Sequence, residues 1–244
     1  MTRPIPPDIQ NAFDAIVKAL ELVFGDSLIG VYGQTFEKPY VVAVVEEPVT
    51  GEQMMNLSKA LVKRIGLTIF SATQIQQGHP YESDYAYGSA LPDLMDPHFR
   101  RIGLLESSRD LTYRDNPVKH TPILRLMGKY GVTLAGHPLR ETLPTISDDE
   151  YRLALRNEAD ACLRALPRHP LIILILCRIL AFWRVGLILA IHEAGAWGIK
   201  NLDPRFQTLI ERAAIEYQSR SETGAYNAYQ LDQFAEYVRD MLKR

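Results

Sequence analysis

The chain has 244 residues and a formal net charge of −2, and 47% of its residues are hydrophobic and 23% charged. These totals predict a globular protein of one large domain or two smaller ones, each able to bury a core. They argue against a nucleic-acid partner, because no basic stripe with interleaved aromatic residues occurs. We expect Cys162 and Cys177 to be buried thiols, since they are too few and wrongly spaced for a zinc site or a disulfide framework. We also expect a cytoplasmic location, because the first ten residues lack the apolar core of a signal peptide.

Helices and strands alternate in the first third of the chain. Apolar residues recur every three or four positions after the N-terminal prolines, which predicts an amphipathic helix. Two β-branched runs predict strands, the second apolar on both faces and therefore central, and a capping box opens a helix that leads to a third strand. The expected elements are a helix from Pro6 to Gly25, strands at 27–32 and 40–45, a helix from Thr50 to Ile65 and a strand at 67–73. This order predicts a small α/β sheet unit.

Glycine and proline residues interrupt residues 74–118, and loops of this length are often functional. Within them the segment Tyr81–Tyr87 (YESDYAY) sets two carboxylates, Glu82 and Asp84, among three phenols. This segment either lines a site or forms an ordinary half-buried strand with alternating tyrosines.

The stretch Leu171–Trp197 is almost wholly apolar. Arg178 and Arg184 would lie near the middle of any membrane-spanning window, where each costs about 2.5–3.5 kcal/mol, so a buried helix in a soluble domain is favoured. A guanidinium in such a helix reaches a carboxylate, a helix C-terminus or a ligand phosphate, and the ion pair is the favoured interpretation. Gly186 is expected to end this helix, and a second helix follows from Ala190 to Gly198.

The rest of the second half also predicts helices, in a bundle of about five. The expected segments are Thr121–Tyr130, a short apolar run at Val132–Ala135, and helices at Ser147–Leu166, Pro204–Gln218 and Ala228–Leu242. We therefore predict an α+β protein with an α/β domain at residues 1–118 and a helical domain at residues 119–244.

Four blocks of the second half carry a family resemblance. They are HTPILRLMGKYGVTLAGHPLRETL (His120–Leu143), LILCRILAFWRVGLILAIHEAGAWGI (Leu174–Ile199), PRFQTLIERAAIEYQ (Pro204–Gln218) and QLDQFAEYV (Gln230–Val238). In order and spacing these blocks resemble the helical C-terminal domain of the aminoglycoside adenylyltransferases that modify streptomycin and spectinomycin. The first half is similar in layout to the N-terminal domain of that family. The resemblance implies a nucleotidyltransferase-like mixed sheet followed by an all-α bundle, with ATP and Mg²⁺ as cofactors of an active member.

The resemblance also implies roles for individual residues. In the family a Gly-Ser turn cradles the ATP phosphates, an Asp-x-Asp pair holds two Mg²⁺ ions, and a further glutamate takes the hydroxyl proton. Here Gly33 and Gln34 stand at the turn, Arg178 is a further nucleotide-binding candidate, and Glu82 matches the general base. Lys38-Pro39-Tyr40 stands where the Asp-x-Asp pair is expected, so we assign no metal ligand.

On the substrate side, the resemblance implies acidic and aromatic residues that bind a polycationic aminoglycoside. Our candidates are Asp84, Tyr85, Tyr87 and Asp160. The loop that enters the apolar stretch, Leu166–Pro170, is basic rather than acidic, and Ile191 stands where the family has a lysine. For Asp160 and the nearby Glu158, a solvated helix face is the favoured interpretation.

The missing carboxylates favour a diverged family member that is deficient in metal-dependent nucleotidyl transfer and is retained for binding a small molecule or nucleotide. The alternative is an active enzyme that transfers AMP from ATP to a hydroxyl of an aminoglycoside or another small molecule. Its metal site would be assembled from Glu37, Glu46, Glu82 or Asp84. A third hypothesis is a structural or partner-binding protein. In each case we expect a monomer or dimer with no nucleic-acid or membrane partner.

Overall fold

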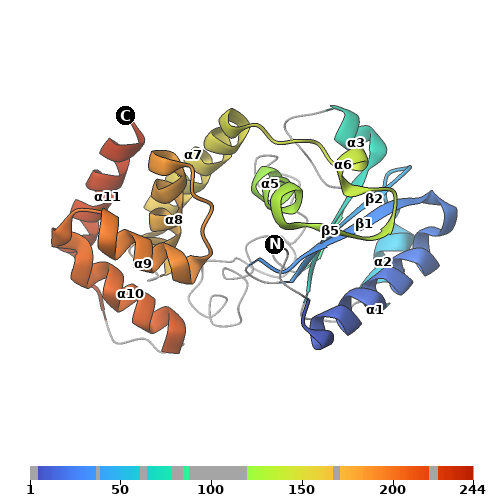
Figure 1. Ribbon diagram of the computed structural model, residues 1–244, viewed down its shortest axis with the longest axis horizontal. Helices are drawn as coiled ribbons and strands as arrows, with labels where there is room; N and C mark the ends of the chain where they lie inside the picture. The colour runs from blue at the N-terminus through green and yellow to red at the C-terminus, as the bar shows by residue number, and fades with distance from the viewer. Residues whose placement is uncertain are drawn as a thin grey trace. The chain divides into compact units, whose positions relative to one another are not determined.

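The computed structural model describes residues 5–36, 39–60, 65–77, 85–87, 120–166, 171–219 and 225–243, with residues 58–60, 85–87 and 165 described by their backbone alone. The chain forms two compact units, Met1–Tyr151 and Arg152–Arg244. The first unit contains the sheet, and the second is helical throughout its described part (Figure 1).

The first unit is built on a five-stranded mixed sheet. Its strands are β1 (Leu28–Gln34), β2 (Tyr40–Val45), β3 (Gly66–Ser71), β4 (Tyr85–Tyr87) and β5 (Val132–Gly136). They lie in the order β4-β3-β2-β1-β5. β1 pairs antiparallel with β2 and β5, β2 pairs parallel with β3, and β3 pairs antiparallel with β4. The predicted mixed sheet is confirmed, and β5 adds an edge strand that the sequence did not predict.

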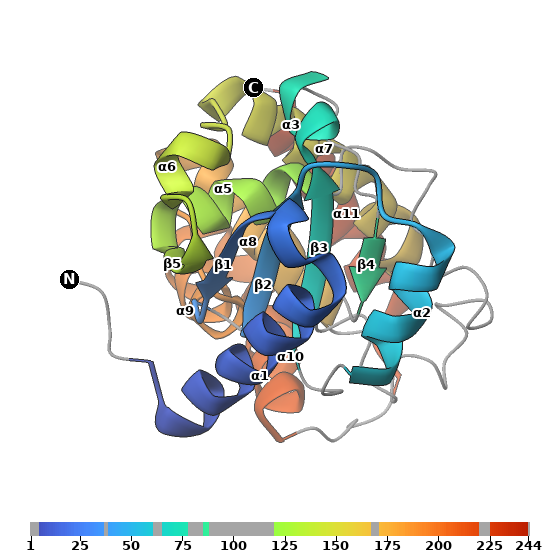
Figure 2. The ribbon, with the colours of Figure 1, turned by 90° about the vertical axis from the view of Figure 1, so that its right-hand side faces the viewer.

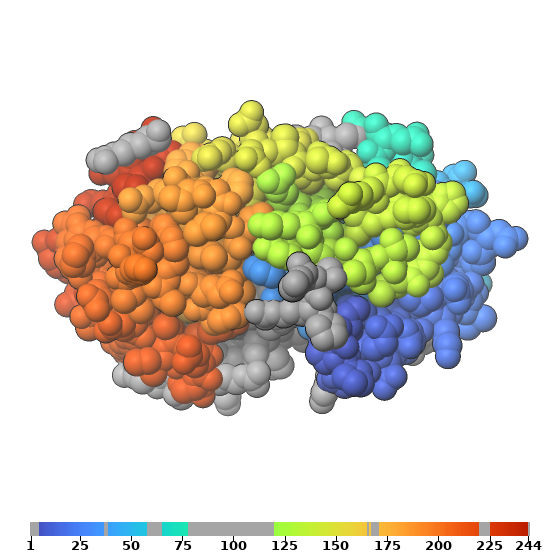
Figure 3. Space-filling model, in the orientation of Figure 1, coloured from blue at the N-terminus to red at the C-terminus, as the bar shows by residue number. Residues whose placement is uncertain are grey.

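Helices cover both faces of this sheet. α1 (Pro7–Phe24) and α2 (Gly51–Ala60) pack on one face, and α5 (His120–Tyr130) packs on the other (Figure 2). Side chains alternate between faces along a strand, so the odd-numbered residues of β2 and β3 join the core under α1 and α2, and the even-numbered residues face α5. Two short helices, α3 (Ala72–Gln77) and α6 (Leu139–Thr142), complete the unit. In the space-filling view the segment that contains β5 and α6 lies beside α1 (Figure 3).

The second unit is helical, as predicted. Its described helices are α7 (Asp148–Ala165, which begins in the first unit), α8 (Leu171–Val185), α9 (Ile191–Asn201), α10 (Gln207–Ser219) and α11 (Ala228–Leu242). α8 is the apolar stretch, and eleven of its fifteen residues are buried because the other helices surround it. Among the described helices, none has the length and apolar character needed to cross a bilayer.

Several element ends differ from the prediction. Residue 65 lies in a bend and not in a helix, and the strand expected at 67–73 ends at Ser71, after which α3 begins. The helix expected to close at Gly198 continues to Asn201. The pairing of β5 with β1 keeps residues 132–136 with the first unit, although we expected the domain division after residue 118. That assignment of family domains stays a prediction.

Candidate functional site

The turn after β1 is closed by its own side chains. Gln34 is buried, and its Oε1 accepts the backbone N–H of Phe36 at 2.6 Å. The Phe36 ring stacks on Tyr130, with centroids 4.1 Å apart and planes 5° apart. Tyr130 is the last residue of α5, and β5 starts two residues later with Val132, which pairs with Gly33. The register between β1 and β5 therefore brings the two rings together.

Gly33 is fixed by the close approach of α1 and β5. A Cβ atom at Gly33 would lie 2.9 Å from Cδ1 of Leu134 and 3.0 Å from Cε2 of Phe13. Real Cβ atoms rarely come this close to a neighbour, so a larger residue here would require the Leu134 or Phe13 side chain to shift. Its nucleotide-binding role stays a prediction.

Tyr32 anchors β1 to the segment that follows β5. Its phenol is fully buried and donates a hydrogen bond to the carbonyl oxygen of His137 at 3.1 Å. Burial raises the pKa of Tyr32, and a hydrogen bond with Thr142 lowers it by less. The phenol therefore stays protonated at neutral pH and is no candidate for a general base.

Tyr40 stands at the position of the expected Asp-x-Asp pair and is used for sheet structure. Tyr40 is 3% exposed, and its phenol shares a 2.7 Å hydrogen bond with Oγ1 of Thr68, which is fully buried on β3. The parallel register places Gly66 opposite Tyr40 and Val42 opposite Thr68, so the phenol reaches along β3 toward Thr68. The two hydroxyls satisfy each other inside the sheet.

This position does not fit Mg²⁺. That ion prefers carboxylates and other hard oxygen ligands, whereas Tyr40 and Thr68 offer two neutral hydroxyls that are bonded to each other. Within the described ranges, no group of three or more His, Cys, Asp and Glu side chains is placed to hold a metal ion. We therefore derive no catalytic step through Mg²⁺ at this position.

Glu46 and Glu47 lie at the opposite end of β2. The β1–β2 register places Gln34 opposite Tyr40 and Leu28 opposite Val45, so Tyr40 and Glu46 are separated by the length of the strand, about 20 Å. Both glutamates are exposed. Glu46 therefore cannot share an ion with groups beside Tyr40.

The remaining carboxylate candidates, Glu37, Glu82 and Asp84, lie outside the described residues. Tyr85 and Tyr87 form the ends of β4, so a strand is confirmed at this point of the segment Tyr81–Tyr87. Tyr87 pairs with Leu67, which pairs with Val41, which pairs with Gly33. The backbones of Tyr87 and Gly33 therefore lie in one row across the sheet, three strand spacings or about 14 Å apart. Whether either tyrosine binds a substrate stays a prediction.

In the second unit, Arg178 of α8 pairs with Glu158 of α7. Their Nη2 and Oε1 atoms are 3.0 Å apart, and the side chains are only 14% and 11% exposed. The favoured ion pair is confirmed, and the interpretation of Glu158 as a solvated residue is wrong, because it lies against α8. Asp160 is exposed, in agreement with a solvated face. Arg184 donates to the backbone oxygen of Asn201, the C-terminal residue of α9.

The sequence did not indicate that Tyr130 and Phe36 are partners. The one local sign of a contact was that each is an aromatic residue at or just after the end of an element, α5 for Tyr130 and β1 for Phe36. Cys162 and Cys177 are free and buried, as predicted.

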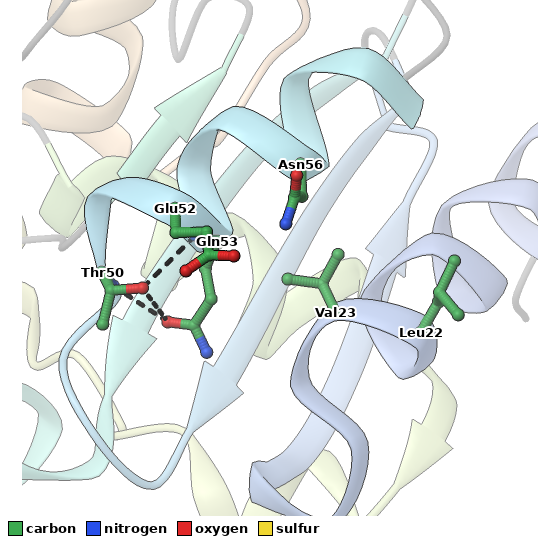
Figure 4. Close-up of a pocket in the computed structure, with 6 residues that line it drawn as sticks. All are labelled: Leu22, Val23, Thr50, Glu52, Gln53 and Asn56. Atoms are coloured by element: carbon green, nitrogen blue, oxygen red, sulfur yellow. Dashed lines mark hydrogen bonds between the residues drawn. The ribbon is translucent and has the colours of Figure 1, made fainter.

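A groove of about 570 Å³ lies between the end of α1 and the start of α2. It is lined by Leu22, Val23, Thr50, Glu52, Gln53 and Asn56 (Figure 4). The side chains of Thr50 and Gln53 hydrogen-bond to each other and to the first turn of α2, which confirms the predicted capping box. The groove lies on the face of the sheet that carries α1 and α2, away from the phenol of Tyr40, so it is separate from the Tyr40 position.

Comparison with known proteins finds a family match over the helical part and a similar solved structure over nearly the whole chain. Residues 141–244 match the family model described as aminoglycoside adenylyltransferase, C-terminal domain. No curated protein matches the sequence significantly. Among solved structures, the chain is similar to a spectinomycin adenyltransferase from Enterococcus faecialis, whose crystal structure contains ATP and spectinomycin. The TM-score is 0.70 and the identity 20%, over 96% of this chain and 99% of that chain.

At this identity the structural likeness shows a shared fold, a nucleotidyltransferase-like sheet domain with a helical C-terminal domain, and the predicted fold class is confirmed. The family match covers the helical part and agrees with the blocks that carried the resemblance in the sequence. Residues 141–244 of the chain are therefore similar to the C-terminal domain of the aminoglycoside adenylyltransferases, and the chain as a whole shares the fold of the solved relative.

Proposed function

We propose that this chain is a diverged aminoglycoside-adenylyltransferase-like protein, a pseudoenzyme that lacks metal-dependent nucleotidyl transfer and binds a small molecule or nucleotide. The observation that carries the proposal is the buried hydrogen bond between Tyr40 and Thr68. It occupies the position where the family resemblance implies metal-binding carboxylates. A phenol bonded to a threonine hydroxyl does not supply the negative charge of the carboxylates that Mg²⁺ prefers.

Two further contacts support the proposal. The Phe36 N–H, a backbone donor in the turn after β1, is bonded to Gln34, so it does not face a phosphate. The Arg178 guanidinium, the other nucleotide-binding candidate, is paired with the Glu158 carboxylate. Both groups that would favour a triphosphate are engaged with other parts of the chain.

Retention of a binding function is supported by the fold. The solved relative was crystallised with ATP and spectinomycin, and its fold extends over nearly the whole of this chain. We therefore take a nucleotide or a small polar molecule as the ligand class.

The test is a transfer assay combined with a binding assay. Purified protein is incubated with labelled ATP, spectinomycin or streptomycin, and Mg²⁺ or Mn²⁺, with the spectinomycin adenyltransferase as positive control. We expect no AMP transfer, and we expect ATP or an aminoglycoside to raise the midpoint of thermal unfolding equally with EDTA and with Mg²⁺. Transfer that EDTA abolishes would show that the chain is the active enzyme of our alternative hypothesis. A midpoint that no ligand moves would remove the binding role and favour a structural protein.

A further inference from the structure

We infer that the groove between α1 and α2 binds an extended peptide of a partner protein, in which apolar residues alternate with lysine or arginine. The groove has a volume of about 570 Å³, within the usual range for binding sites. The inference is independent of the proposed function, because the groove lies on the face of the sheet away from the phenol of Tyr40.

One wall of the groove is apolar. It is formed by Leu22 and Val23 in the last turn of α1. Leu22 is 85% exposed, and no other large hydrophobic side chain in the described part of the chain is more exposed. Covering such a side chain with another apolar group removes its surface from water, which is favourable. The α1 wall therefore favours an apolar group of a partner.

The other wall is polar and comes from the start of α2. The Asn56 side chain points from α2 toward Val23 of α1 (Figure 4). Among the described residues, its amide has no hydrogen-bond partner. A carboxamide offers a donor and an acceptor side by side, which matches the N–H and C=O groups of a peptide backbone. An extended segment has these backbone groups free, whereas a helix uses them internally, so the wall favours an extended segment.

Carboxylates surround the polar wall. Glu52 lines the groove, Asp26 lies two residues after α1, and Glu46 and Glu47 lie shortly before α2. The Glu46 N–H donates to the carbonyl oxygen of Ser27 at 2.9 Å, which holds the two connecting segments together. All four carboxylates are exposed, and within the described ranges none of them forms an ion pair. This charge complements lysine or arginine side chains.

The charged residues on the far side of α1 do not neutralise the groove. Helix residues follow one another at about 100°, so Lys18 lies about 40° and Glu21 about 100° from Leu22, in the direction away from Val23. Lys18 is the one cation among the described side chains of α1 and α2. Glu21 is an exposed carboxylate of the same helix that is turned away from the groove, and it therefore offers a matched control.

The two walls define the sequence pattern of the partner. Successive side chains of an extended segment point to opposite sides. In this groove an apolar residue can then face Leu22 while the next residue, if basic, faces Glu52. A segment with alternating apolar and basic residues satisfies both walls along its length.

The experiment measures the fluorescence anisotropy of a labelled peptide with the full chain at low salt. The probe is Leu-Lys-Leu-Lys-Leu, blocked at both ends, and the control peptides carry serine in place of leucine or glutamate in place of lysine. We expect saturable binding of the probe with a dissociation constant below about 1 mM. We expect each control peptide to bind at least about tenfold more weakly.

Protein variants locate the binding. Leu22→Ser should weaken binding of the probe about tenfold, and Glu52→Gln about threefold. The matched controls are Leu153→Ser, at an exposed leucine of α7, and Glu21→Gln, and each should change binding by less than about twofold. All four side chains are exposed, so the variants should keep the thermal unfolding midpoint of the wild type. Absence of saturable binding, or equal losses in test and control variants, overturns the inference.

Two further measurements distinguish a peptide from a small cation. Asn56→Ala should weaken binding of the probe about threefold and leave binding of a backbone N-methylated probe unchanged, because only the first can use the carboxamide. Equal losses for both peptides contradict backbone recognition. N-acetyl-lysine amide is tested as a competitor, and an affinity equal to that of the probe would show a small-cation site and refute peptide binding. None of these outcomes depends on AMP transfer, so the proposed function and this inference can fail separately.

Discussion

The hydrogen bond between Tyr40 and Thr68 gives a quantitative test of whether this position serves the fold. Tyr40→Phe removes the phenol oxygen and leaves the buried Thr68 hydroxyl without this partner, and Thr68→Val does the reverse. Each hydroxyl that loses this partner costs about 1–3 kcal/mol of unfolding free energy, whereas the double variant removes both hydroxyls of the pair. We therefore expect the double variant to lose about 1–2 kcal/mol less than the sum of the single variants.

The assay is urea unfolding followed by circular dichroism, with the four proteins of the cycle at one pH and salt concentration. At a slope of roughly 3 kcal/mol/M, a coupling of about 1.5 kcal/mol moves the midpoint by about 0.5 M. The matched control is the exposed hydrogen bond between Gln10 and Asp14, 2.8 Å long, whose coupling is expected to be about 0.5 kcal/mol or less. A coupling at Tyr40 and Thr68 no larger than the control would refute the structural role and leave the phenol available to a ligand.

Three further changes test other parts of the fold. Gly136→Ala should lower stability by more than about 2 kcal/mol, because Gly136 has a φ of +75° and a Cβ atom there would collide with a backbone oxygen of β1. Gly186→Ala is the control, since Gly186 has a φ of +69° but lies in open space, and it should cost only about 1–2 kcal/mol. Both losses are measured by thermal unfolding, and equal losses would contradict the collision. Tyr226→Phe removes the phenol that donates to the buried Glu216 carboxylate at 2.9 Å and should cost about 1.5–3 kcal/mol, and a neutral variant would show that the bond does not persist in solution. Cys177 should react with a thiol reagent only after unfolding, since burial raises its pKa and excludes the reagent, and rapid labelling of the native protein would disprove that burial.

Elements with strong local signals could be predicted from the sequence. α11 has the predicted bounds because an amphipathic run follows Asn227, whose side chain caps the helix by accepting the N–H groups of Tyr229 and Gln230. β2 also has the predicted bounds, because a continuous β-branched run is typical of a central strand. The predicted end of β3, at residue 73, was wrong. Ala72 and Thr73 continue a strand-like run in the sequence, although they form the first turn of α3.

Features that depend on distant parts of the chain could not be predicted. β5 pairs with β1 across about one hundred residues, and a short apolar run gives no sign of its partner. In the candidate site, the absence of carboxylates at Tyr40 could be read directly from the sequence. The bond from Tyr40 to Thr68 could not, because it depends on the register of two strands joined through a helix. The same holds for Glu158, whose partner Arg178 lies on another helix.

The register also connects the two features on which the proposed function depends. Gln34 and Tyr40 are direct partners across β1 and β2, so the closed turn and the cross-strand phenol lie side by side at one end of the sheet. A buried carboxylate at position 40 would need a cation to offset its desolvation, whereas a phenol needs only a hydrogen-bond partner, which Thr68 supplies. A buried amide at position 34 similarly satisfies the turn without an anion. Neither Tyr40 nor Gln34 carries a charge, so neither side chain needs a charged ligand to balance it. This end of the sheet therefore holds two neutral side chains, each with a hydrogen-bond partner inside the chain.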